Sequence, residues 1–188
     1  MLKKQLQLLI ETTPVALLPI ERKYAEEQGL LEESTDVLTA TFQSSVVERC
    51  IKETEEPVAG TDAAFYTQPI SYLKEHEEEF VYVEANRFDV VGIDAVALEF
   101  DRLYGSYTAL FGFQMQKKYG DAIKSYLDEN LQETAVPYSI SFSGQDGLWE
   151  MNINVGAIPG FNDTQSFEQV ISAFYEFMFR LLESVEQQ

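Results

Sequence analysis

The fold class is decided by residues 138–155, which read YSISFSGQDGLWEMNINV. Apolar side chains alternate with small polar ones on both sides of a Gly-Gln-Asp-Gly sequence at residues 144–147. This alternation is typical of two antiparallel strands with one buried face and one polar face. Glycine and aspartate between the two runs are typical of a turn. We therefore predict a β-hairpin over residues about 137–156.

The register of this hairpin separates its residues into two faces. The apolar face, which we expect to point toward the core, consists of Tyr138, Ile140, Phe142, Trp149, Met151 and Ile153. The polar face consists of Ser139, Ser141, Ser143, Glu150, Asn152 and Asn154. This polar face is either a solvated surface of the sheet or the floor of a pocket, and we keep it as a candidate site. Its acidic and amide side chains do not have the spacing of an EF-hand calcium loop.

Two long apolar segments predict helices that pack on this sheet. Residues about 166–186 begin with a possible capping box formed by Ser166 and Gln169,. Residues about 94–118 have apolar side chains at helical spacing, from Val96 to Leu110,. Together with the hairpin, this order of elements predicts an α+β fold in which helices pack on one face of an antiparallel sheet.

The last predicted helix also bears on assembly. Its apolar residues cover an arc of roughly 200° on a helical wheel, which is more than one sheet covers. The surplus is covered either by the predicted helix over residues 94–118 or by a second copy of the chain around a two-fold axis. A homodimer through this helix is therefore possible, although a monomer is favoured.

The length and composition predict one globular domain over residues 1–188,. Residues about 54–68 contain Pro57, Gly60 and several acids, so we expect a mobile acidic loop there,. No apolar stretch is long enough to span a bilayer, and the first residues do not resemble a signal peptide. The single cysteine, Cys50, is compatible with a reducing compartment, so we expect a cytoplasmic protein,.

The charge of the chain is extreme and limits its partners. The sequence contains 13 lysines and arginines against 32 acids, for a formal charge of −19 and a pI near 4.2. Such a surface repels the phosphate backbone of nucleic acids and anionic membrane surfaces. It serves either solubility alone or the attraction of a basic protein partner. The run Glu75-His76-Glu77-Glu78-Glu79 is a candidate acidic surface for such a partner.

The sequence offers no recognisable catalytic constellation. It lacks the glycine-rich loops that hold phosphates and the nucleophile elbow of hydrolases,. With one cysteine and one histidine, it cannot build a cysteine cluster or a multi-histidine metal site,. His76 could act as a base or a metal ligand, but a solvated position beside acids explains it more simply. We therefore predict no catalytic residue, cofactor site or metal site.

These observations favour a non-catalytic interaction module that binds a basic protein, as inhibitors, immunity proteins and nucleic-acid mimics do. The alternative is a small-molecule-binding domain or a carboxylate-dependent enzyme with a pocket over the polar face of the hairpin. A flat acidic surface would favour the first function. A deep cleft with paired carboxylates would favour the second.

Overall fold

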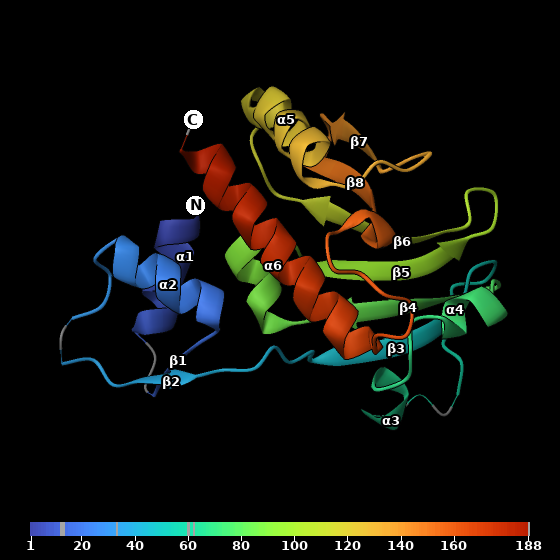
Figure 1. Ribbon diagram of the computed structural model, residues 1–188, viewed down its shortest axis with the longest axis horizontal. Coiled ribbons are helices and arrows are strands. Elements are labelled where there is room, and N and C mark those ends of the chain that lie inside the picture. Colours follow the sequence, from blue (N-terminus) through green and yellow to red (C-terminus); the bar gives the residue numbers. More distant parts are fainter. Residues whose placement is uncertain (12–13, 33, 60, 62, 188) are drawn as a thin grey trace.

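The computed structural model has a six-stranded antiparallel sheet at its centre, in the order β3-β4-β5-β6-β8-β7 (Figure 1). The structure describes residues 1–11, 14–32, 34–59, 61 and 63–187. The strands of this sheet are β3 (Val46–Ile51), β4 (Glu79–Glu84), β5 (Ala95–Asp101), β6 (Ser106–Phe113), β7 (Tyr138–Ser143) and β8 (Leu148–Asn154). Because helices accompany this sheet, the predicted α+β fold is confirmed.

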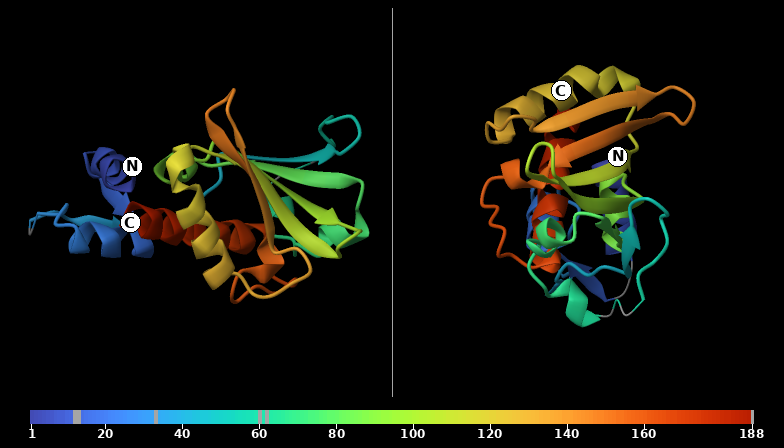
Figure 2. Two further views of the ribbon diagram at one scale, coloured as in Figure 1. Left: turned by 90° about the horizontal axis from the view of Figure 1, so that it is seen from above. Right: turned by 90° about the vertical axis from the view of Figure 1, so that its right-hand side faces the viewer.

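Two helices cover one face of the sheet. The helix α6 (Phe167–Glu186) crosses that face, and α5 (Gly120–Asn130) packs beside it over the β8–β7 end. Figure 2 (left) shows both helices on the same side of the sheet. The predicted capping box is present at the start of α6, where the side chains of Ser166 and Gln169 bond each other's backbone N–H groups. This arrangement confirms that helices pack on one face.

The strands alternate between a buried face and an open face. In β5, for example, Val96, Leu98 and Phe100 are buried while the residues between them are only half-buried. The buried side chains meet α6, and the ring of Phe111 packs edge-on against that of Phe174 with their centroids 5.0 Å apart. Among the described residues, no helix packs on the opposite face (Figure 2).

The predicted helix over residues about 94–118 is wrong, because this segment forms the antiparallel strands β5 and β6. Gly105 has a left-handed φ of 61° in the turn between them,. Asp101 stabilises the same turn, since its Oδ1 accepts hydrogen bonds from the backbone N–H groups of Leu103 and Tyr104. Both strands are central, and apolar residues such as Ala97 and Leu110 also occupy their open face. The clean alternation that marks a strand is therefore lost, and the apolar residues also fit a helical spacing.

The hairpin predicted over residues about 137–156 is confirmed as β7 and β8. On β8 the apolar side chains of Trp149, Met151 and Ile153 are buried as predicted. Those on β7 are only half-buried, because β7 is the edge strand of the sheet. The register is the predicted one, since Ser139 and Ser141 are exposed.

The first part of the chain forms a small layer beside the C-terminal half of α6 (Figure 1). A two-stranded parallel sheet and two helices make up this layer, namely α1 (Leu2–Ile10), β1 (Val15–Leu17), α2 (Pro19–Glu27) and β2 (Val37–Thr39). The ring of Tyr24 packs edge-on against Phe179, with centroids 5.7 Å apart. This layer covers the side of α6 that the sheet leaves free.

The wide apolar arc of α6 is therefore covered within one chain. Phe174, Phe177 and Leu181 are all buried. The cover comes from the sheet, from α5 and from the first layer. This helix consequently gives no physical reason for a second copy of the chain to bind.

Short elements complete the fold. They are α3 (Ala63–Tyr66), α4 (Tyr72–Glu75) and the 3-10 turns Asn86–Val91, Lys117–Tyr119 and Val155–Ala157. Within the segment 54–68, Pro57 forms an isolated β-bridge to Cys50, whereas residues 60 and 62 lie outside the described residues. The mobility of that segment stays a prediction. No helix of the described residues has the length and apolar character needed to cross a membrane.

Candidate functional site

The polar residues of the hairpin lie on the open face of the sheet, as the register predicts. Ser141 donates a hydrogen bond of 2.9 Å to Glu150 across the two strands, and Ser143 donates one of 2.6 Å to Asp146 in the turn. At this end of the hairpin, the polar groups therefore form hydrogen bonds with one another. At the other end, Asn154 is buried, whereas Asn152 is exposed. The structure thus divides the predicted polar face into two parts.

The open face continues across the whole sheet beyond the hairpin. The registers place Leu110, Ala97 and Tyr82 in one row from β6 to β4, and Phe80 lies beside Tyr82 on β4. These side chains form an apolar band that is half-buried rather than covered. We call this band with its surrounding acids the open acidic face.

Carboxylates surround the apolar band of the open acidic face. They belong to Glu48, Glu84, Glu99, Asp101 and Glu150. Tyr82 donates a hydrogen bond of 2.7 Å to Glu84, which is the largest cause of a rise in the pKa of Tyr82 to about 12. Among the ion pairs of the described residues, one brings a cation to this face. It joins Lys52 Nζ to Glu99 Oε2 at 3.2 Å. The face is therefore strongly negative.

Two adjoining cavities open at the end of the sheet where Asn154 lies. The smaller, of about 130 Å³, lies over Ser139, Asn152 and Asn154 of the predicted polar face and also touches Glu99 and Asp101. The larger has a volume of about 520 Å³. The two cavities share Tyr104, Ser106, Val136 and Asn154. Part of the predicted polar face is therefore the wall of a pocket, while the rest is a solvated surface.

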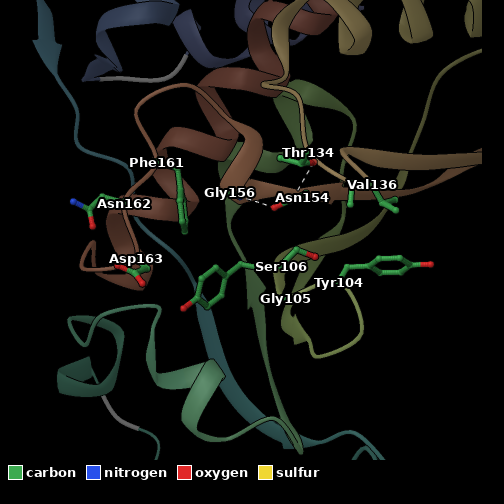
Figure 3. Close-up of a pocket in the computed structure, with 12 residues that line it drawn as sticks. Tyr104, Gly105, Ser106, Thr134, Val136, Asn154, Gly156, Phe161, Asn162 and Asp163 are labelled. Atoms are coloured by element: carbon green, nitrogen blue, oxygen red, sulfur yellow. Dashed lines mark hydrogen bonds between the residues drawn. The ribbon is translucent and has the colours of Figure 1, made fainter.

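Three segments that are distant in sequence enclose the larger cavity (Figure 3). They are the β5–β6 turn with the start of β6 at residues 104–107, the loop at residues 134–136 before β7, and residues 154–163 from the end of β8 onward. Figure 3 shows Tyr104 and Val136 on one side, and Phe161 and Asp163 on the other. A volume of this size is in the range of small-molecule sites.

Asn154 joins two of these segments, the loop before β7 and the residues after β8. Its side-chain oxygen accepts a hydrogen bond of 2.9 Å from the N–H of Gly156, and its amide nitrogen donates one of 3.4 Å to the hydroxyl of Thr134 (Figure 3). The backbone N–H of Asn154 also donates to the carbonyl of Pro137. Because the side chain is buried, its amide bonds define the shape of the cavity wall,.

Tyr107 has an unusual place in the larger cavity. Its side chain lines the cavity and is 7% exposed, and among the described residues its hydroxyl has no hydrogen-bond partner. Its ring packs against those of Phe100 and Phe161, with centroids 5.1 and 5.6 Å away. Burial raises the pKa of Tyr107, and the charges of Asp163 and Glu75 raise it further. The hydroxyl is therefore neutral near pH 7 and lies in a negative electrostatic field.

The predicted acidic run around residues 75–79 is only partly a surface. Glu75 and Glu78 are exposed, and Glu77 is half-buried with Oε2 3.6 Å from Arg102 Nε. His76 lies beside Glu78, with Nδ1 3.8 Å from its Oε1. The run therefore contributes to the negative surface, but basic groups of the chain itself accompany it.

Glu79 does not belong to that surface, which corrects the prediction for this residue. It is 7% exposed because it begins β4 with its side chain toward the helices. Its carboxylate accepts a 2.9 Å hydrogen bond from Tyr72 and lies 3.7 Å from the guanidinium of Arg49. Ligand atoms of His76, Glu78 and Glu79 lie within 4.8 Å of one another. A metal ion there would compete with the Arg49 guanidinium for Glu79.

Sequence reasoning missed most residues of the larger cavity. Tyr107 was assigned to a helix that does not form, and Phe161 and Asp163 lie in a loop without a motif. No local signal connects residues 104–107 with residues 154–163, since the sheet register alone brings them together.

Comparisons with protein-family models, with curated proteins and with solved structures found no match to this chain. The candidate site is therefore defined by geometry alone. It consists of the open acidic face and the larger cavity at the end of the sheet.

Proposed function

We propose that this protein is a non-catalytic interaction module that binds a basic protein partner through its open acidic face. One observation carries the proposal: an apolar band on the open side of the sheet is surrounded by carboxylates. Protein interfaces commonly have an apolar centre and a charged rim. The partner would belong to the class that inhibitors, immunity proteins or nucleic-acid mimics recognise.

The net charge supports the same proposal at longer range. A charge of −19 attracts a basic protein and accelerates its approach, whereas it repels nucleic acids and anionic membranes,. Once the partner is bound, the rim carboxylates would pair with its lysines and arginines. With a single cysteine the chain uses no internal disulfide, which is compatible with a reducing cytoplasm as the location of this encounter,.

The test is affinity capture from a native lysate, followed by mass spectrometry, with two charge-matched variants. The face variant carries Glu48→Gln and Glu150→Gln, both at exposed positions on the open acidic face. The control variant carries Glu11→Gln and Glu129→Gln, which are exposed elsewhere and remove the same charge. The proposal predicts a basic protein that the wild type and the control retain.

The face variant should retain roughly tenfold less of that protein, since each exposed pair contributes up to about 1 kcal/mol. Retention should also fall at 0.5 M salt, because salt screens exposed charges. Equal losses in both variants would show that only the net charge matters. Undiminished retention by the face variant would contradict the proposed surface.

A second function is supported by the larger cavity. Its volume of about 520 Å³ and its wall of aromatic and amide side chains suit a small molecule,. We therefore also propose a small-molecule-binding role for the end of the sheet. A carboxylate-dependent enzyme is less well supported. Asp163 is the one charged residue among those that line the larger cavity. In the smaller cavity, Glu99 is paired with Lys52, and Asp101 accepts hydrogen bonds from the backbone of the β5–β6 turn.

A further inference from the structure

The larger cavity presents aromatic rings to whatever occupies it. Tyr107 and Phe161 pack with their centroids 5.6 Å apart and their planes tilted by 44°. Tyr104, which is 51% exposed, lies on the opposite side of the cavity (Figure 3). Aromatic faces of this kind bind flat apolar groups, and they attract cations through the negative charge above each ring.

The charge in the cavity wall is negative. Asp163 carries it, and no lysine, arginine or histidine is among the described residues that line the cavity. No ion pair within the described part of the chain involves the Asp163 carboxylate. The side chains of Thr134, Asn154 and Asn162 add neutral polar groups to the wall. An anionic ligand would therefore meet repulsion there, whereas a cation would find an unpaired carboxylate.

Tyr107 lines the cavity, but its hydroxyl oxygen is covered by protein atoms. Buried hydroxyls nearly always have a hydrogen-bond partner, but this one has none among the described residues,. Burial raises its pKa, and the charges of Asp163 and Glu75 raise it further, so this part of the wall is negative as well.

We propose that the larger cavity binds a small organic cation, in which an ammonium group is attached to a flat apolar body. The ammonium group would pair with Asp163, while the apolar body would lie against the packed rings of Tyr107 and Phe161. This inference rests on the second function proposed above, that the cavity is a ligand site. It does not depend on the basic protein partner.

The test compares three probes of nearly equal size and shape, namely phenethylamine, 2-phenylethanol and 3-phenylpropionate. Their charges at pH 7 are positive, neutral and negative. Binding is followed by NMR titration, with the backbone amides of Gly105 and Gly156 in the cavity wall as reporters. We expect phenethylamine to shift these amides and to bind at least about tenfold more tightly than the other probes.

Two variants test which groups of the cavity wall contribute to the binding of phenethylamine. Asp163→Asn should weaken phenethylamine binding by up to about fivefold, whereas Asp146→Asn in the distant hairpin turn removes the same charge and should leave it nearly unchanged,. Tyr107→Phe keeps the ring that lines the cavity and should leave phenethylamine binding nearly unchanged. Without ligand it should not lower the urea midpoint of unfolding, because it removes a hydroxyl that has no partner,.

The outcomes separate the inference from the small-molecule function on which it rests. If 2-phenylethanol or 3-phenylpropionate binds as tightly as phenethylamine, the cationic class is wrong while the small-molecule function stands. If no probe shifts the two amides at millimolar concentration, both are overturned. Equal effects of Asp163→Asn and Asp146→Asn would reduce the attraction to the overall charge of the protein and would also overturn the inference.

Discussion

At the scale of single residues, the buried carboxylate of Glu21 links separate parts of the fold through hydrogen bonds. Glu21 is fully buried on α2, and its two oxygens bond groups from three parts of the fold. They accept hydrogen bonds from the N–H of Leu18 at 2.8 Å, from Arg87 at 2.7 Å and from the hydroxyl of Tyr175 on α6 at 2.6 Å. Arg87 also donates to the carbonyl of Ala16. Glu21 therefore joins the first layer to the rest of the molecule.

We predict that Glu21→Gln lowers the free energy of unfolding by about 3–5 kcal/mol, because it leaves the largely buried Arg87 cation without a counter-ion,. The matched control is Glu26→Gln on the same helix, which breaks the exposed Arg22–Glu26 pair and should cost less than about 1 kcal/mol,. Urea unfolding at pH 7 measures both variants. Similar costs for the two would show that the buried network adds nothing to stability.

At the scale of elements, the two strands of the last hairpin differ because of their positions in the sheet. β8 lies between β6 and β7, whereas β7 is an edge strand. Trp149 on β8 is consequently 6% exposed, and its ring packs edge-on against Phe142 with centroids 5.2 Å apart. It also lies close to the start of α5, where a Cβ at Gly120 would lie 2.6 Å from the Trp149 Cη2 atom. Trp149 thus connects the sheet with α5.

Trp149→Ala should therefore lower the free energy of unfolding by about 3–5 kcal/mol, since it leaves a cavity between β8 and α5. Glu150→Gln, at the next position on the exposed face of the same strand, should change it by no more than about 0.5 kcal/mol,. Both values come from urea unfolding followed by far-UV circular dichroism. A loss below about 1 kcal/mol for Trp149→Ala would contradict its place in the core.

At the scale of the whole molecule, the tyrosines respond to burial and to nearby acids. The pKa is raised to about 12 in three tyrosines from different elements: Tyr66, Tyr82 and Tyr138. Burial is the main cause for Tyr66 and Tyr138, whereas the hydrogen bond to Glu84 is the main cause for Tyr82. The folded protein therefore keeps these protons at a pH where the unfolded chain, with a tyrosine pKa of about 10, loses them.

This difference predicts a loss of stability in alkali. Because the folded pKa is the higher one, the contribution of these tyrosines is complete below pH 10 and disappears as the pH rises toward about 12,. The urea midpoint should fall between pH 10 and pH 11.5, and Tyr82→Phe should make that fall smaller. If the urea midpoint falls by the same amount with pH in the wild type and in Tyr82→Phe, the raised pKa of Tyr82 is contradicted.

The sequence by itself determined the local parts of this protein. The alternation of residues 138–155 specified the hairpin and its register, because an edge strand and its neighbour expose one polar face,. The capping box at Ser166 and the wide apolar arc specified α6. The composition specified the negative charge of the surface. Each of these properties depends on residues that are close together in the chain.

Only the tertiary structure decided the remainder. Residues 95–113 form two central strands, because neighbouring strands and α6 cover them from positions that their own spacing does not reveal. The sheet register likewise brings Tyr107 near Asp163 and surrounds the apolar band with carboxylates from separate strands. Contacts of this kind join residues that are far apart in the chain, so local periodicity carries no information about them.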